Sequence, residues 1–124
     1  METIHLIGHS RPVLINSIIW LEGEANYTRV HYQNGTCSIV TQPLMWFEHR
    51  LSFIRIHRSA IVNPTHVQEF SHKSGRSGWV RLIDDRVIPV SRNRLKQTTV
   101  LLSTKSELSH SLNQIGYLKT LIAG

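Results

Sequence analysis

The sequence predicts a mainly β protein with short helices and a longer helix near its C-terminus. Short apolar or alternating segments, separated by Gly, Pro, Asn and Asp, fill most of the first hundred residues, which is typical of strands joined by turns. From about residue 91 onwards, apolar residues recur instead at helical spacing. The chain has 124 residues, 40% hydrophobic and 18% charged, which suits one core of ordinary size.

Two hairpins are the clearest local features of the predicted sheets. Residues 27–32 alternate in polarity, Asn34-Gly35 supplies a tight turn with positive φ, and residues 36–41 form the return strand. A second hairpin is expected around Asp84-Asp85, between strands at residues 79–83 and 87–90. The remaining polar stretch, residues 71–78, is expected to be a mobile loop. Further strands are predicted at residues 3–7, 13–15, 18–21, 53–56, 60–62 and 67–70.

Helices are predicted at three places. Pro43 suits a first helical residue, and the following spacing of Leu44, Phe47 and Leu51 gives one buried stripe. Ser91 is expected to cap a helix that runs to about Leu102. Residues 104–107 match a capping box that would begin a C-terminal helix. The apolar face of that helix consists of Leu108, Leu112, Ile115, Leu118 and Ile122. The predicted organisation is a domain over residues 1–103 and a C-terminal helical extension over residues 104–124.

Basic charge is concentrated in the second half of the chain. The net charge is +6, and Arg outnumbers Lys by ten to four. Residues 50–96 alone hold ten basic residues and three acidic ones. A segment rich in Arg suggests a polyanionic partner, because the guanidinium group matches the geometry of phosphate oxygens and base edges.

The residue pattern argues against catalysis, metal binding and secretion. Histidine occurs eight times, but the only aspartates are Asp84 and Asp85, and no hydrolase, nucleotide-binding or phosphate-binding motif is present. The single cysteine, Cys37, excludes an internal disulfide and is expected to be a small packing residue. The longest apolar run is too short for a membrane span, and the N-terminus does not resemble a signal peptide. We therefore expect a cytoplasmic protein with no enzymatic activity, cofactor, metal or membrane partner.

Three polar clusters lie where strands end or a helix begins, and they are candidate contacts to nucleic acid. The first enters the first predicted hairpin, the second ends the strand at residues 53–56, and the third opens the helix after Val90. Their side chains can reach base edges or phosphates. The clusters are Asn26, Tyr27 and Thr28; Arg55, His57, Arg58 and Ser59; and Ser91, Arg92, Asn93 and Lys96.

In this order, the clusters resemble the LytTR DNA-binding domain of bacterial transcription regulators. The resemblance covers roughly residues 3–102, and its longest match is F-I-R-I-H-R-S-x-I-V-N at residues 53–63. Shorter matches lie at residues 18–22, 25–28 and 88–92. The resemblance implies an elongated arrangement of small antiparallel sheets. It also implies that three loops contact successive major grooves of double-stranded DNA, often at paired direct repeats, and that the duplex bends. A homodimer on the DNA would fit such repeats.

The resemblance assigns DNA contacts to all the residues of the three clusters. Base readout is expected from Arg58, Arg92 and the Asn26 loop, while Arg and Lys contacts to phosphates supply most of the affinity. Residues that match the family but are expected to be structural are Glu22, Phe53, Ile61, Val62, Asn63 and Pro89.

The chain departs from the family pattern in three ways. It has no room for the receiver domain that often precedes the DNA-binding domain. The segment 50–52 leads very directly into the next strand, and the helix after Thr104 extends beyond the part of the chain that matches the family.

Two other functions also stay open. One is a protein-interaction module that uses the C-terminal helix and sheet edges, with DNA binding incidental. The other is an RNA-binding β platform, which is less favoured because Tyr27 lacks an evident stacking partner.

Overall fold

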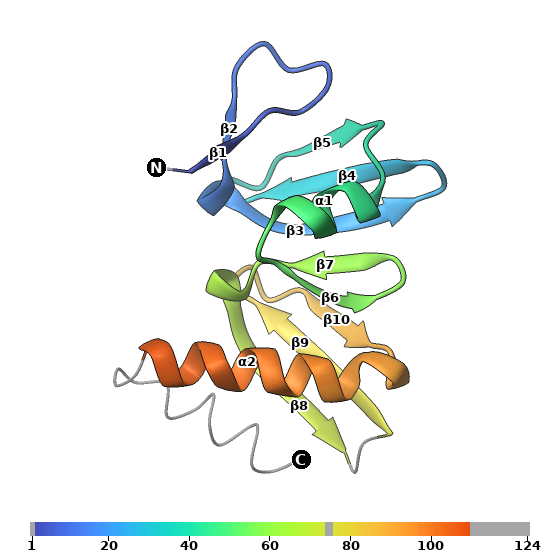
Figure 1. The fold of residues 1–124 in the computed structure, drawn as a ribbon, viewed down its shortest axis with the longest axis vertical. Helices are drawn as coiled ribbons and strands as arrows, with labels where there is room; N and C mark the ends of the chain where they lie inside the picture. The colour runs from blue at the N-terminus through green and yellow to red at the C-terminus, as the bar shows by residue number, and fades with distance from the viewer. Residues whose placement is uncertain (1, 74–75, 110–124) are drawn as a thin grey trace.

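Three antiparallel sheets follow one another along the long axis of the molecule (Figure 1). The structure is a computed structural model that describes residues 2–73 and 76–109, the last six of them by secondary structure alone. A two-stranded arm lies at one end, a five-stranded sheet in the middle and a three-stranded sheet at the other end. This elongated, mainly β architecture confirms the fold class predicted from the sequence.

The arm and the central sheet contain the N-terminal half of the chain. The arm pairs β1 (Thr3–Ile4) with β2 (Val13–Leu14), and the 3-10 helix η1 (Ile15–Ser17) leads into the central sheet. The strand order of that sheet is β5-β4-β3-β7-β6. Its strands are β3 (Ile18–Glu24), β4 (Tyr27–Tyr32), β5 (Cys37–Val40), β6 (Ile54–His57) and β7 (Ala60–Val62). Helix α1 (Leu44–Arg50) packs on this sheet through Leu44 and Phe47, as its predicted stripe requires.

The third sheet and the second helix follow. The 3-10 helix η2 (Pro64–His66) leads into β8 (Val67–Lys73), which pairs with β9 (Ser77–Leu82), and β9 pairs with β10 (Val87–Val90). The 3-10 helix η3 (Arg92–Arg94) then runs directly into α2 (Leu95–Ser109). No helix in the part of the chain that the structure describes is long and apolar enough to cross a membrane.

The central sheet separates two hydrophobic cores. Strand β7 is buried along its whole length because Ile61 enters one core while Ala60 and Val62 enter the other. The first core lies under α1 and the arm and includes Phe47. The second core joins the central sheet to the third sheet and α2, and includes Phe70. Both faces of the sheet are therefore held by packing.

The predicted loop at residues 71–78 is wrong. Strands β8 and β9 pair as far as Lys73 and Ser77, so a hairpin occupies most of this stretch. The segment contains few apolar residues because one face of the hairpin is exposed. Gly78 marks the other face: a Cβ atom placed there would lie 2.6 Å from Cδ2 of Leu95, so α2 approaches the strand backbone closely.

Three turn and cap predictions also need correction. In the first hairpin only Gly35 has positive φ, at 88°, and the loop covers residues 33–36 rather than two residues. Pro43 is the N-cap of α1 instead of its first residue. Cys37, expected to pack, is exposed. All three differences lie at exposed positions, where the local sequence constrains the structure only weakly.

The C-terminal helix differs from its prediction as well. The Ser91 side chain makes no cap hydrogen bond to the helix, because its hydroxyl instead donates to the carbonyl of Ile56 at 3.3 Å. Helix α2 continues without a break through residues 104–107, so the predicted capping box starts no new helix. The apolar positions expected at Leu112, Ile115, Leu118 and Ile122 lie outside the described residues.

Candidate nucleic-acid interface

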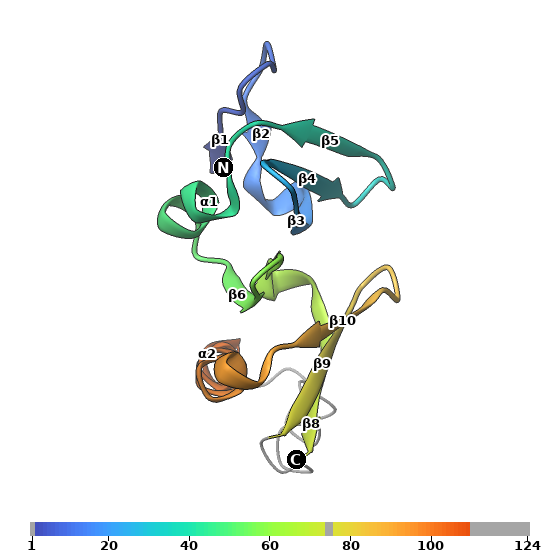
Figure 2. The same ribbon diagram turned by 90° about the vertical axis from the view of Figure 1, so that its right-hand side faces the viewer.

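Three turns that carry the predicted contacts lie along one edge of the molecule. Tip 1 is the turn at residues 25–26 between β3 and β4, and tip 2 is the turn at residues 58–59 between β6 and β7. Tip 3 is the segment 91–96, which joins β10 to the first residues of α2. All three occupy the right-hand edge of Figure 1, which faces the viewer in Figure 2. We call this side of the molecule the tip edge.

Backbone hydrogen bonds fix the three tips relative to one another. The amide of Gly23, just before tip 1, donates to the Ser59 carbonyl in tip 2 at 2.8 Å. The amide of Ser91 in tip 3 donates to the Ile56 carbonyl beneath tip 2, also at 2.8 Å. Both bonds join the backbone of different elements, so tips 1 and 3 are each held against the strands that carry tip 2.

Tip 1 combines an unusual backbone with exposed polar groups. Ala25 has a φ of 55°, a left-handed conformation that is uncommon for residues other than Gly. Asn26 is exposed, and Tyr27 retains 50% of its accessible surface. Thr28, in contrast, is fully buried, and its hydroxyl donates to the Gln42 carbonyl at 2.7 Å. This placement gives Thr28 a role in supporting the tip rather than in contacting a partner.

A hollow of about 380 Å³ joins the first tip to the second. Tyr27 lines it from tip 1, Arg58 and Ser59 line it from tip 2, and Met45 at the start of α1 closes one side. Met45 is 62% exposed. Two of the predicted clusters therefore share one surface, with an apolar side chain between them that the sequence did not single out.

Arg55 holds tip 2 in its shape. Its Nε donates to the carbonyl of His57 at 3.0 Å, and its Nη2 donates to the carbonyl of Arg58. Its Nη1 forms a salt bridge with Oε1 of Glu48 on α1 at 2.7 Å. The guanidinium is thus used inside the protein, and Glu48 is a functional residue that sequence reasoning missed. No local signal could have revealed it, because the contact depends on how α1 packs.

The second half of tip 2 orients a histidine. Nδ1 of His57 accepts a hydrogen bond from the Ser59 amide at 3.2 Å and lies 3.0 Å from the Ser59 hydroxyl. A neutral ring with Nδ1 as acceptor carries its hydrogen on Nε2. His57 therefore offers an N–H donor of the kind that phosphate oxygens or guanine acceptors bind.

Tip 3 presents most of its polar side chains to solvent. Arg92, Asn93 and Lys96 are exposed, and Arg94 is half-buried. Ser91 is the exception, because its amide and its hydroxyl both bond to Ile56. Of the eleven predicted residues, Thr28, Arg55 and Ser91 support the tips through side-chain hydrogen bonds to backbone carbonyls, and the other eight lie at the tips or directly beside them.

The basic residues divide into compensated and free groups. A cation counts as free when its side chain has no hydrogen bond, ion pair or aromatic ring as partner within the described residues. The compensated residues are Arg29, Arg50, Arg55, Arg81 and Arg86. The free ones, among the side chains that the structure describes, are Arg11, Arg58, Lys73, Arg76, Arg92, Arg94 and Lys96. All except Arg11 lie at tip 2, at tip 3 or at the β8–β9 hairpin.

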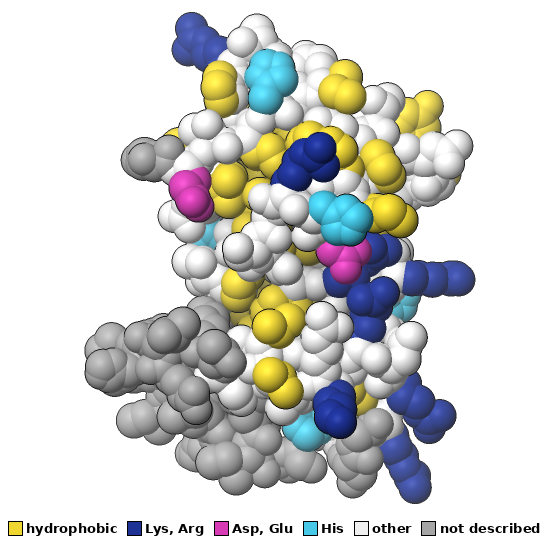
Figure 3. All heavy atoms as spheres, in the orientation of Figure 1, with side chains coloured by type: hydrophobic (Ala, Val, Ile, Leu, Met, Phe, Trp, Pro, Cys, Tyr) yellow, Lys and Arg dark blue, Asp and Glu magenta, His cyan; other side chains and the backbone are white. Residues whose placement is uncertain are grey.

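Figure 3 shows the result for the surface: Lys and Arg side chains project along the right-hand edge of the molecule. Acidic groups pair with three of the five compensated arginines, Arg29, Arg55 and Arg81. Beside β4, the Cys37 sulfur at 3.7 Å from Nη1 and the Glu24 carboxylate at 3.0 Å from Nη2 raise the pKa of the Arg29 guanidinium above its ordinary value. Apart from Arg11, the free positive charges of the described side chains are therefore concentrated at tips 2 and 3 and at the β8–β9 hairpin.

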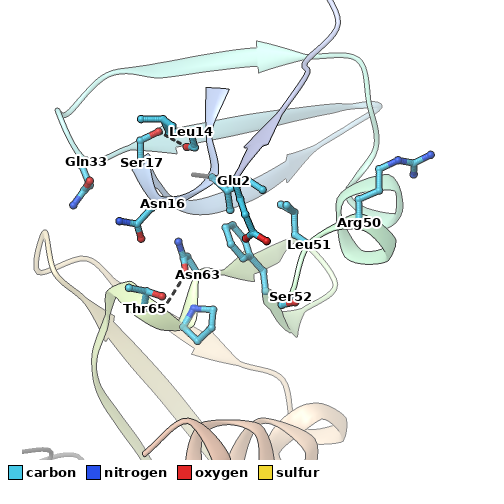
Figure 4. Close-up of a pocket in the computed structure, with 13 residues that line it drawn as sticks. Glu2, Leu14, Asn16, Ser17, Gln33, Arg50, Leu51, Ser52, Asn63 and Thr65 are labelled. Atoms are coloured by element: carbon cyan, nitrogen blue, oxygen red, sulfur yellow. Dashed lines mark hydrogen bonds between the residues drawn. The ribbon is translucent and has the colours of Figure 1, made fainter. Parts of the chain in front are cut away.

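A larger cavity of about 570 Å³ does not share this character. It lies at the opposite ends of the strands, between η1, η2 and the end of α1 (Figure 4). The Glu2 carboxylate reaches into it, whereas Arg50 points away and stacks on Trp46 with Cζ 4.3 Å from the ring centroid. Among the residues that line the cavity, the Glu2 carboxylate faces the space and no cation does, which does not suit a polyanionic ligand.

On the resemblance to a DNA-binding domain, we expect that replacing Glu48 by Ala weakens binding to duplex DNA about tenfold, or by about 1.4 kcal/mol. The reason is that Arg55 would lose its anchor on α1 and tip 2 would lose its fixed shape. Fluorescence anisotropy with a labelled duplex measures the change. If Arg55 instead contacts DNA directly, the same variant would release its guanidinium and remove a negative charge, so binding would strengthen. The sign of the effect therefore separates the two roles.

A mainly β chain with its free cations gathered along one edge has the features of a nucleic-acid-binding domain. The family model for the LytTr DNA-binding domain matches residues 8–103. The sensory transduction protein LytR of Staphylococcus haemolyticus is 30% identical over 96 residues, a match that covers 68% of this chain and 38% of that relative. A solved LytTr DNA-binding domain from Bacillus cereus has a TM-score of 0.69 at 26% identity and covers 82% of this chain and 94% of its own.

The chain therefore belongs to the LytTR family of DNA-binding domains. This finding confirms the resemblance identified from the three clusters, and it identifies residues 8–103 as a domain of a DNA-binding family, which is not an enzyme family. The matched residues 8–103 contain all three tips.

Proposed function

We propose that this protein is a transcription regulator that recognises a specific sequence in double-stranded DNA through tips 1, 2 and 3. The observation that carries the proposal is the grouping of free cations along the tip edge, together with membership of a DNA-binding family. Binding inside the bacterial cytoplasm, where the DNA is, fits this activity. Family membership favours DNA over the protein-interaction and RNA-binding alternatives.

The residues of the three tips have different roles in DNA recognition. We assign base readout to Asn26, Arg58 and Arg92, since exposed amide and guanidinium groups suit base edges. Arg94 and Lys96 contact phosphates, and the remaining contacts come from Tyr27, His57, Ser59 and Asn93. Arg55, Thr28 and Ser91 position the tips through the internal hydrogen bonds described above. The tips enter successive major grooves, and two copies of the protein occupy paired direct repeats.

Selection of binding sites from random duplex DNA tests the proposal. Sequence-specific binding predicts that a short motif is enriched, and that the motif occurs twice in the same orientation if two copies bind direct repeats. Enrichment of no motif, with equal affinity for all duplexes, would contradict a role in specific recognition.

Replacing Arg92 by Ala should cost about 1–3 kcal/mol in binding to the selected site if its guanidinium reads a base. Binding to random DNA should change much less, because a base contact matters only on the correct sequence. Parallel titrations of the two duplexes measure the difference. Equal losses on both would reassign Arg92 to the phosphate backbone.

A further inference from the structure

The hairpin between β8 and β9 carries two free cations that the three tips leave out. Lys73 ends β8 and Arg76 precedes β9, and both side chains are exposed. The other basic residues of this sheet are compensated: Arg81 pairs with Glu69 and Asp85, and Arg86 lies over the Trp20 ring. Among the described basic side chains of this sheet, Lys73 and Arg76 are therefore the two without a partner.

Strand register places this hairpin beside tip 3. Strand β10 pairs with β9 so that Val90 lies opposite Gly78. Tip 3 begins directly after Val90, and Arg76 lies two residues before Gly78. The pairing ends there, because the Ser91 amide bonds to the Ile56 carbonyl and Arg92 begins η3, so the two segments are neighbours through Val90 and Gly78. Figures 1 and 2 agree with this placement, because the hairpin lies at the lower end of the tip edge in both views.

The strands on either side of the turn pack next to the end of tip 3. They pair as far as Lys73 and Ser77, and the Arg76 amide donates to the Lys73 carbonyl at 2.9 Å. The close approach of Leu95 to Gly78 fixes the start of α2 against the same hairpin. Packing therefore couples the position of the two cations to the position of tip 3.

We propose that Lys73 at the end of β8 and Arg76 directly before β9 form a fourth DNA contact, which binds the phosphate backbone next to the sequence contacted by tip 3. This inference rests on the proposed function and extends its footprint. Phosphate is the expected partner because both groups are isolated cations. The neighbouring polar ring, His72, is half-buried and stacks on Phe70 at a centroid distance of 5.4 Å, so it is not placed to read bases.

A salt titration of the double variant Lys73→Gln, Arg76→Gln tests the proposal. Each phosphate contact contributes about 0.9 to the slope of log affinity against log salt, so loss of both contacts should flatten the slope by about 1.8. Affinity should fall by the same factor on the selected site and on random DNA. Arg11→Gln is the control, because Arg11 is also a free cation but lies in the loop of the arm, away from the tip edge. Its slope should equal that of the unmodified protein.

Shortening the duplex provides a second readout. Trimming base pairs from the end beneath tip 3 should reduce the affinity of the unmodified protein to that of the double variant, and should leave the variant unchanged. Trimming from the other end should affect both proteins alike. Equal slopes and equal affinities of the two proteins on the long duplex would overturn the fourth contact. Failure of the unmodified protein to prefer any duplex would instead overturn the proposed function.

Discussion

Raising the salt concentration from about 50 to about 200 mM should weaken the complex with DNA by about two orders of magnitude. Of the six free cations at the tip edge and the β8–β9 hairpin, Arg58 and Arg92 are assigned to bases, and Lys73, Arg76, Arg94 and Lys96 to phosphates. Each cation that neutralises a phosphate releases about 0.9 of a counterion, so the slope of log affinity against log salt should be about −3.6. If only Arg94 and Lys96 bind phosphates, the loss should be about one order of magnitude.

The distinction between free and compensated cations provides the control. Arg81 belongs to the same sheet as the β8–β9 hairpin but is paired with Glu69 and Asp85. Arg81→Gln should therefore leave the slope unchanged, although it removes the same formal charge as Arg76→Gln. A slope shallower than about −1 for the unmodified protein would contradict the electrostatic basis of the interface.

Strand positions could be predicted where sequence alternation and burial coincide. The alternating segment at residues 27–32 forms β4 with the predicted bounds, because one of its faces enters the core through Val30. The hairpin at residues 71–78 escaped prediction because its stability comes from pairing and from contact with Leu95, which lies in a different element. Local polarity carries little information where backbone hydrogen bonds and distant packing determine the structure.

The candidate site shows the same limit at the level of single residues. The sequence identified the clusters, but it could not distinguish exposed donors from donors used within the protein. Arg55 and Arg58 are three residues apart, yet the first binds two backbone carbonyls and Glu48 while the second is free. Compensation also acts across strands: Arg81 meets Glu69, twelve residues earlier in the chain. Only the folded arrangement reveals which cations remain available to DNA.

Replacing Phe47 by Ala should lower the free energy of unfolding by about 3–5 kcal/mol. Phe47 is fully buried in the core beneath α1, so its loss removes a large apolar surface and leaves a cavity among tightly packed neighbours such as Val30 and Ile61. Urea denaturation followed by tryptophan fluorescence measures the change. Since a domain of this size has about 5–15 kcal/mol of stability, the variant should retain only a narrow margin.

Met45 supplies the matched control for this prediction because it lies on the same helix but is 62% exposed. Met45→Ala should change stability by no more than about 0.5 kcal/mol. A loss below about 1 kcal/mol for Phe47→Ala would mean that α1 is not part of the cooperative core. The helix matters for DNA as well, because it carries Glu48 to Arg55 and places Leu44 against Gly23, next to tip 1. Under conditions where the Phe47 variant is still folded, its affinity for the selected site should therefore fall more than its affinity for random DNA.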